Sequence, residues 1–333
     1  MTTLSPSPAK RVDLLPPLLP VALMLAALPL IGSPSAWVTL TAAGLAMGMM
    51  IFIMASGLTL IFGLMDVLNF GHGAFISIGA YVATLVLLPL AGWTQADSLA
   101  LNLAALAPAI LVAMAVTGAL GLVFERVIVM PVYGQHLKQI LVTMGGLIVA
   151  EQLLAALWGP NQIPLPLPAA LRGSVALGDA AIEKYRLVAV IVGLVVFVAM
   201  LAVLGRTKLG LLIRAGVENG EMVEALGYRI RRLFVGVFMA GSALAGLGGV
   251  MWALYRESVT AGMGLEVMVL IFIVVIVGGL GSVGGCFLGS LLVALLANYT
   301  GFLAPKLALG SNIFLMVAIL LWRPQGLYPV GKG

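Results

Sequence analysis

Long apolar runs constrain this chain more than any other feature of its sequence. Residues 37–63 and 99–124 contain no charged side chain, and a helix needs roughly 20 apolar residues to cross the hydrocarbon layer of a bilayer. Charged residues make up only 9% of the chain, against about 25% in soluble domains, so polar side chains are too few to cover a water-facing surface. The short alternating segments of a membrane barrel are absent from the sequence. The sequence therefore predicts an all-α membrane protein.

Ten of these runs are candidate transmembrane helices, and we expect eight to ten to cross because several are short or broken by glycine. The first could instead be a cleaved signal peptide, since Lys10 and Arg11 precede it and small residues follow it; its length favours an uncleaved helix. The predicted spans are 14–31, 37–63, 73–90, 99–124, 139–158, 187–204, 233–254, 265–277, 285–303 and 312–322.

The basic residues predict how the chain lies across the membrane. Ten crossings place both termini on one side, together with 12 of the 17 Lys and Arg residues, and cytoplasmic loops of membrane proteins carry such an excess. We therefore expect a multi-pass protein of the bacterial inner membrane with both termini in the cytoplasm. Its divisions are a disordered N-terminus at 1–13, one transmembrane domain at 14–325 with a cytoplasmic segment at 206–232, and a cytoplasmic tail at 326–333.

Composition argues against several classes of function. The net charge of +5 is explained by cytoplasmic Lys and Arg, and no basic helix with interleaved aromatic residues indicates nucleic-acid binding. Cys286 is the only cysteine and there are two His, too little material for a disulfide, a metal site or a catalytic constellation. The sequence contains no phosphate-binding loop with its lysine, so ATP hydrolysis would need another subunit. We expect no catalytic residue and no cofactor in this chain.

Polar residues and glycines interrupt the apolar pattern between the second and third runs. Asp66, Asn69 and His72 lie there, and Gly71 and Gly73 on either side of the histidine loosen the helix. Non-helical backbone at membrane depth is tolerated only inside protein or beside a water-filled cavity, and intramembrane polar residues are functional candidates. The alternative places Asp66 at the cytoplasmic interface and makes Asn69 and His72 helix caps.

A second glycine-rich break, Gly278-Gly-Leu-Gly-Ser-Val-Gly-Gly285, joins two apolar runs near the C-terminus. It lacks the lysine of a phosphate loop, and its small residues favour close helix packing or a broken helix. Because it and the break at 69–73 occupy comparable places in the two halves of the chain, we expect an inverted repeat with broken or re-entrant segments and a solute path between the halves.

One carboxylate lies inside an otherwise apolar run. Glu151 and its neighbour Gln152 belong to the predicted span 139–158. We expect them to form a hydrogen-bonded pair that faces the bundle, with contact to a solute as the alternative.

The cytoplasmic segment 206–232 contains a short amphipathic helix. Residues 217–226 are predicted to be helical, with Gly227 as the C-terminal stop. A linker that merely joined two spans would not need such a helix, whereas a docking element for a soluble motor protein would; the alternative is a solvated surface helix. One face carries Glu218, Glu221 and Glu224, and an apolar edge carries Met222, Val223 and Leu226.

These segments resemble the permeases of branched-chain amino acid transporters of the ATP-binding-cassette (ABC) class, of the LivH and LivM type and closer to LivH. One departure is Ala74, because many relatives carry an acidic residue directly after the His-Gly pair. The resemblance rests on segments in the family order, namely 57–81, 207–227, 240–249, 278–289 and Arg323-Pro-Gln-Gly-Leu327.

The resemblance implies an importer built from several subunits in the membrane lipid. The partners would be a second, LivM-like permease subunit, two cytoplasmic ATPases that use ATP and Mg, and an external solute-binding protein. The residues implied to line the translocation path are Asp66, Asn69, Phe70, His72, Phe75, Gly278, Gly279, Gly281 and Ser282. The residues implied to couple the chain to an ATPase are Glu218, Glu221, Met222, Val223, Glu224, Ala225, Leu226 and Gly227.

The sequence leaves the solute and the energy source open. Branched-chain amino acids are what the resemblance implies, but sister permeases handle urea, short amides and aromatic acids. A stand-alone, ion-coupled secondary transporter or channel is the alternative function. Such a protein would share the broken helices but would not need the docking segment 207–232.

Overall fold

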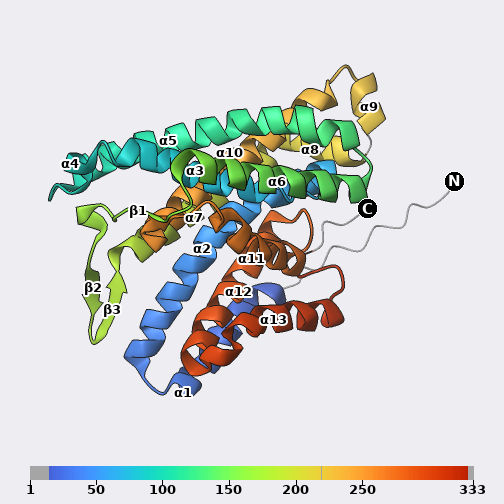
Figure 1. Ribbon diagram of the computed structural model, residues 1–333. Coiled ribbons are helices and arrows are strands. Elements are labelled where there is room, and N and C mark those ends of the chain that lie inside the picture. The colour runs from blue at the N-terminus through green and yellow to red at the C-terminus, as the bar shows by residue number, and fades with distance from the viewer. Residues whose placement is uncertain (1–14, 219, 329–333) are drawn as a thin grey trace.

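The computed structural model describes residues 15–218 and 220–328, which form a helical bundle with two small two-stranded sheets (Figure 1). The all-α prediction is confirmed, and each predicted apolar run coincides with a helix. The longer helices are α1 (Leu15–Ile31), α2 (Pro34–Met65), α3 (His72–Leu87), α5 (Leu99–Phe124), α6 (His136–Trp158), α7 (Lys184–Arg206), α10 (Ile230–Arg256), α11 (Met263–Gly278), α12 (Val283–Leu303) and α13 (Ala308–Trp322).

Shorter elements connect these helices. A π-helical turn, η1 (Glu125–Val129), and three 3-10 turns, η2 (Met130–Val132), η3 (Ala169–Leu171) and η4 (Pro305–Leu307), follow helix ends or lie in loops. Strand β1 pairs with β4, and β2 pairs with β3 as a hairpin. The remaining elements are α4 (Ala91–Thr94), α8 (Lys208–Glu218), α9 (Gly220–Ala225), β1 (Ile163–Pro164), β2 (Ser174–Leu177), β3 (Ala180–Glu183) and β4 (Ser258–Val259).

Within residues 15–218 and 220–328, six helical segments are long and apolar enough to cross a membrane on their own: α2, α5 with its continuation to Val132, α6, α7, α10 and α12. The helices α1, α3 and α11 and the segment Gly310–Trp322 are apolar but shorter. Helices α3 and α11 have 16 residues each, about 24 Å at 1.5 Å per residue, against a hydrocarbon thickness of about 30 Å. They are short because each begins inside the bundle, after a break in the chain.

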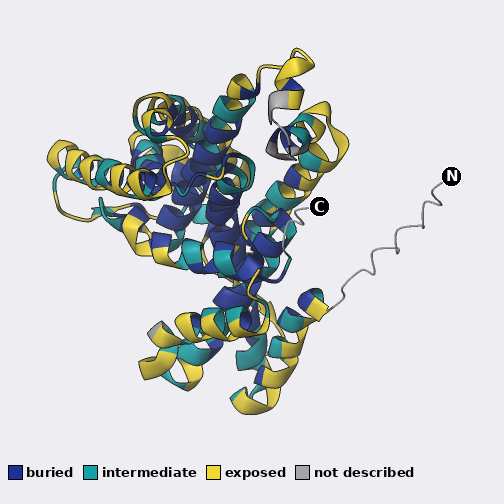
Figure 2. Ribbon diagram, turned by 90° about the vertical axis from the view of Figure 1, so that its right-hand side faces the viewer, coloured by how far each residue is buried: buried dark blue, intermediate teal, exposed yellow. Residues whose placement is uncertain are grey.

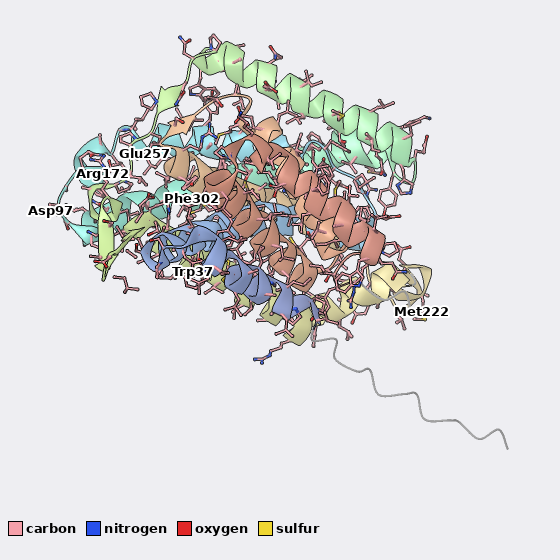
Figure 3. All side chains as sticks on the ribbon, turned by 90° about the horizontal axis from the view of Figure 1, so that it is seen from below. Trp37, Asp97, Arg172, Met222, Glu257 and Phe302 are labelled. Atoms are coloured by element: carbon pink, nitrogen blue, oxygen red, sulfur yellow. The ribbon has the colours of Figure 1, made fainter. Side chains whose placement is uncertain are left out.

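The bundle has two distinct ends. Helices α8 and α9 lie at one end, on the right of Figure 1, and α4 with strands β1 to β3 lies at the other. Figure 3 shows the same division, with Met222 at one end and Asp97, Arg172 and Glu257 at the other. The predicted cytoplasmic segment and the large loop between α6 and α7 are thus on opposite sides.

Helix α2 forms the centre of the bundle. In its most apolar window 78% of the residues are buried, against 17% in α6 and α7, which lie at the periphery. Helices α12, α10, α7 and α11 pack around α2, and α10 also packs on α3 and α5. Figure 2 shows the buried residues along the middle of the bundle and the exposed residues on its outer helices. The chain therefore surrounds one apolar, uncharged helix with the others.

Glycines let the inner helices touch backbone to backbone. Where α2 crosses α10, a Cβ added to Gly241 would lie 2.7 Å from the carbonyl oxygen of Gly57. Where α3 and α11 begin, a Cβ on Gly73 would lie 2.9 Å from the carbonyl oxygen of Gly264, and the reverse contact is tighter still. Small residues at helix crossings permit this close packing in membranes.

The pairs α2–α3 and α10–α11 have the same local geometry. The residues that cap the C-termini of α2 and α10 are Asp66 and Glu257, both in the left-handed region with φ of 52° and 49°. Six residues later α3 and α11 begin, and the first amide of each donates a 3.3 Å hydrogen bond three residues back, His72 to Asn69 and Met263 to Thr260. The equal lengths of α3 and α11 complete a structural repeat.

The two copies of the repeat run in opposite directions. The end of α2 contacts the start of α6, through Tyr133 and His136. The end of α10 contacts the segment after α6, where the Leu165 amide donates to the Glu257 carbonyl over 2.9 Å and β1 pairs with β4. Because α6 runs from one end of the bundle to the other, the repeat is inverted, as expected.

The break at 69–73 does not have Gly278–Gly285 as its counterpart, contrary to the prediction from the sequence. The structural counterpart of residues 66–71 is 257–262, whereas Gly278–Gly285 contains the tight turn between α11 and α12. The second break was missed because Glu-Ser-Val-Thr-Ala-Gly has one glycine and two polar hydroxyls, a composition typical of an ordinary surface loop.

The crossing of α3 and α11 can be tested by adding one methyl group. We expect Gly264→Ala to destabilise the protein by about 1–3 kcal/mol, the usual cost of overpacking a core, because the Gly73 carbonyl occupies the space of the new Cβ. Gly145→Ala on α6 is the matched control, since a Cβ there meets nothing within 4 Å. Heating in detergent, followed by size-exclusion chromatography, measures the loss; equal melting temperatures would contradict the crossing.

Candidate functional site

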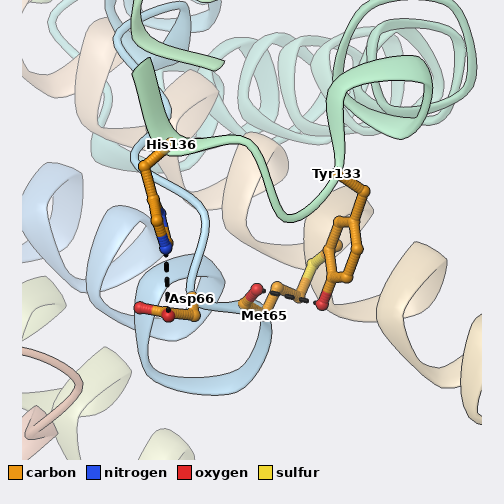
Figure 4. Close-up of polar contacts among 4 residues, drawn as sticks. All are labelled: Met65, Asp66, Tyr133 and His136. Carbon is orange, nitrogen blue, oxygen red and sulfur yellow. Dashed lines mark hydrogen bonds and ion pairs between the residues drawn. The ribbon is translucent and has the colours of Figure 1, made fainter. Parts of the chain in front are cut away.

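The end of α2 is a polar corner at the α8–α9 end of the bundle. Asp66 Oδ2 lies 3.8 Å from His136 Nε2, with 73% and 57% of the two side chains exposed. The Tyr133 hydroxyl donates a 3.0 Å hydrogen bond to the Met65 carbonyl (Figure 4). Burial and the nearby Asp66 charge raise the pKa of Tyr133, so the phenol keeps the proton that it donates. Asp66 thus lies exposed at the end of a helix, which agrees with the alternative that placed it at the cytoplasmic interface.

Asn69 and His72 follow this corner and are fully buried. The His72 Nε2 lies 2.9 Å from the Met54 carbonyl oxygen, eleven residues before the end of α2, so the break returns the chain into the bundle. Among the residues that the structure describes, the Asn69 amide oxygen and nitrogen and the His72 Nδ1 have no hydrogen-bond partner. An unpaired buried polar group costs about 1–3 kcal/mol, so this cluster needs an explanation other than stability.

Two phenylalanines predicted for the path lie in different surroundings. The Phe70 ring is half-buried and packs on Phe272 of α11 with centroids 4.4 Å apart, and its amide donates to Thr143 Oγ1 of α6 over 3.2 Å. Phe75 is buried between Phe124 and Phe238, at 5.4 and 6.3 Å. Phe70 thus joins α3, α6 and α11 at the first break, whereas Phe75 is part of the apolar core.

The turn between α11 and α12 lies against the first half of the molecule. Gly279 and Gly281 have φ of 101° and 81°, which glycine adopts without strain, and Ser282 Oγ accepts from the Gly285 amide over 3.1 Å. A Cβ on Gly63 would lie 2.6 Å from the Gly281 Cα. The structure therefore brings this turn beside the end of α2, next to the polar corner.

The segment after α13 covers the same turn. The Leu327 amide donates to the Val277 carbonyl over 2.9 Å, and the Tyr328 amide donates to Gly278 over 3.0 Å. These bonds satisfy two of the carbonyls that every helix leaves free at its C-terminus. The contact lies at the end of the motif Arg323 to Leu327 and was not predicted from the sequence.

The second break has polar contacts of its own. Ser77 Oγ of α3 donates to the Ala261 carbonyl and accepts from the Gly264 amide, both at 2.9 Å. Glu151 of α6 is half-buried, with Oε1 3.1 Å from the position of a Cβ on Gly262. Sequence reasoning missed Ser77, whose signal was its place one turn after Gly73.

The hydrogen-bonded pair of Glu151 and Gln152 that the sequence predicted is not formed. Glu151 lies against the second break, whereas its neighbour Gln152 is exposed, and no hydrogen bond joins the two side chains. Glu151 is therefore a half-buried carboxylate next to the non-helical backbone of the second break.

The predicted coupling helix 217–226 is two helices instead of one. Helix α8 ends at Glu218 and α9 begins at Gly220, and Asn219 lies outside the described residues, as do the side chains of Glu218 and Glu221. Asn-Gly disfavours helix, whereas Leu209, Leu212 and Ile213 extend the helical pattern toward the N-terminus. The Thr207 hydroxyl accepts from the Gly210 amide over 3.3 Å and starts α8.

Helix α9 presents a mixed face outward. Gly227 has φ of 88°, and the amides of Gly227 and Tyr228 donate to Glu224 and Val223, so Gly227 is the helix stop that was predicted. Val223 is 2% exposed and faces the bundle. The outward face consists of the exposed residues Met222, Glu224, Ala225 and Leu226. We call these four residues the α9 face.

Comparison with known proteins gives a consistent result. The family model for the permease component of the branched-chain amino acid transport system matches residues 40–321. The chain is 26% identical over 300 residues to the high-affinity branched-chain amino acid transport permease BraD of Pseudomonas aeruginosa, covering 85% of this chain and 93% of that protein. It is 24% identical over 300 residues to LivH of Escherichia coli, covering 85% and 92%. No solved structure matches significantly.

The unpaired amide of Asn69 gives a test that separates function from stability. We expect Asn69→Leu to keep or raise stability, because it removes a buried amide without partners, while solute uptake falls several-fold. Asn102→Leu is the control, since Asn102 is equally buried but makes three hydrogen bonds, to Trp93, Ala96 and Ala170; its loss should lower stability by about 1–3 kcal/mol. Melting in detergent and cellular uptake report the two effects. Unchanged uptake in Asn69→Leu would remove Asn69 from the path.

Proposed function

Because the chain belongs to the family of branched-chain amino acid transport permeases, we propose that it is the LivH-like membrane subunit of an ABC importer that carries branched-chain amino acids into the cytoplasm. The observation that carries this proposal is the match of the family model over residues 40–321. The inverted pair of broken helices and the α9 face support it. Like its relatives, the chain is a transport subunit and not an enzyme.

We expect the rest of the importer to surround this chain on both sides of the membrane. A second, LivM-like permease subunit would complete the solute path, and the chain is 31% identical over 157 residues to a probable LivM of Methanocaldococcus jannaschii, which supports a homologous pair. An external solute-binding protein would dock at the end that carries α4 and the strands. Two ATPases would lie on the cytoplasmic side of the inner membrane and would use ATP and Mg, and one of them would dock at the α9 face.

Helix α10 offers the route from an ATPase to the path. Its first turn follows α9 directly through Gly227 to Arg229, and its other end is the second break at Glu257. Between these points α10 packs on α2, α3 and α5. A displacement of the α9 face would therefore move α10, which packs on α2 and α3 next to the first break and ends at the second. The solute would pass beside Asn69, Phe70 and the turn at Gly281, which lie around the meeting point of α2, α3 and α11.

A carboxylate near the path supports an amino acid as solute. Ala74 occupies the place of an acidic residue in many relatives, and it is buried. Glu151, beside Gly262 of the second break, offers a negative charge that pairs with the ammonium group of an amino acid. Urea and short amides have no such group, so Glu151 favours amino acids over those solutes.

Reconstitution tests the function. We expect the chain, co-purified with its ATPases and second permease and placed in liposomes, to take up leucine only with ATP and the loaded binding protein. Glu151→Gln should reduce leucine uptake several-fold while leaving assembly intact, because the amide cannot balance the ammonium charge. Uptake that survives ATP removal but collapses with an ion gradient would contradict the importer.

The helix stop at Gly227 gives a test of coupling. Gly227→Ala places a Cβ at φ of 88°, a strain of about 1–2 kcal/mol, and should alter the end of the α9 face. We expect more ATP hydrolysed per solute transported. Gly134→Ala is the matched control. Gly134 has φ of 77°, a Cβ added there meets nothing within 4 Å, and the residue lies outside the cytoplasmic segment 206–232. An equal ratio in both variants would exclude α9 from coupling.

A further inference from the structure

A basic cavity of about 560 Å³ lies where α9 joins α10. Among the side chains that the structure describes, its lining includes Arg126, Arg229, Arg231 and Arg232 and a single carboxylate, Glu224. Among the side chains that the structure describes, these arginines form no ion pair. Four guanidinium groups around one cavity favour an anionic group, above all a phosphate, which arginine binds through two parallel hydrogen bonds.

An apolar cavity of about 1090 Å³ lies on the other side of the same junction. Helices α2, α5, α7, α8 and α10 line it, with aliphatic side chains such as Leu64, Met200 and Leu244. Along α10 it extends from Arg229 to Leu247, about 27 Å at 1.5 Å per residue, against about 15 Å for one hydrocarbon leaflet. The cavity is therefore deep enough for an acyl chain.

The two cavities share four residues. Gly227, Tyr228, Arg229 and Arg232 line both, so one side of this segment is basic and the other apolar. A ligand that fills both needs an anionic head and an apolar tail. We propose that an anionic phospholipid of the cytoplasmic leaflet binds here, with its phosphate on the arginines and an acyl chain between α7, α8 and α10.

The surroundings favour lipid over a protein occupant. The apolar cavity lies between helices of this chain, where buried Val223, Met200 and Val237 line it, and not on a flat face. Helix α8 is amphipathic and directs Leu209, Leu212 and Ile213 into the cavity, as helices at a membrane surface direct their apolar side into lipid. Basic pockets between transmembrane helices on the cytoplasmic side are where anionic lipid head groups bind.

The bound lipid would join the α9 face to α10. Both cavities include Gly227, two residues after the end of α9, and both include Arg229, which precedes the first residue of α10. A lipid between them restrains the joint through which α9 acts on α10. The binding does not rest on the proposed function, whereas this consequence for coupling does.

Native mass spectrometry of the full-length chain tests the proposal. The probes are phosphatidylglycerol and phosphatidylcholine with the same palmitoyl and oleoyl chains, together with inorganic phosphate. We expect phosphatidylglycerol to bind in preference to phosphatidylcholine. Arg229→Gln with Arg232→Gln should weaken it roughly tenfold or more, since each basic residue near a membrane surface adds measurably to the attraction; Lys138→Gln, on the same side but outside both cavities, should not.

Binding of the lipid's acyl chain is tested separately by filling the apolar cavity. Gly236 lines it, and a Cβ there meets nothing within 4 Å, so Gly236→Leu should fold normally and displace the acyl chain. Gly301→Leu on α12, where the space is also open, is the control. Equal binding of both lipids, equal binding to all variants, or full displacement by inorganic phosphate would each overturn the proposal. So would a co-purified subunit that removes the lipid from both cavities.

Discussion

Backbone polar groups cannot remain unpaired in a membrane, and this structure starts two helices inside its bundle. Helices α3 and α11 begin at His72 and Met263. The backbones of the residues that follow, Gly73 and Gly264, touch, and Ser77 pairs with groups that the second break would otherwise leave free. A side chain at either glycine would separate the helices. The close contact therefore places both breaks inside protein, and the rest of the bundle is arranged around it.

Two helices with different surroundings, α2 and α10, pack next to the crossing of α3 and α11. Helix α2 is uncharged along its length and buried at the centre, which makes it a fixed support. Helix α10 starts at a basic, exposed junction with α9 and ends at the second break, so it connects α9 with that break. The proposed lipid lies at that junction. The same helix thus connects every site that we infer.

The sequence predicted the helices well and the breaks only in part. Apolar length identifies a span without reference to its neighbours, and the glycines around His72 revealed the first break. The second break, Glu257 to Gly262, is specified by contacts with Leu165, Ser77 and Gly73, which are distant in the chain. Likewise, no local pattern predicted that Val223 faces inward while Met222 faces outward, or that the Leu327 amide donates to a carbonyl of α11.

The inverted repeat is the central claim, and labelling of single cysteines tests it most directly. Cys286 is buried and is the only native cysteine, so Cys286→Ser provides a background for Asp66→Cys and Glu257→Cys, both at exposed ends of the repeat. A membrane-impermeant maleimide should label Asp66→Cys only in inside-out vesicles and Glu257→Cys only in right-side-out vesicles. Labelling of both from the same side would contradict the inverted arrangement.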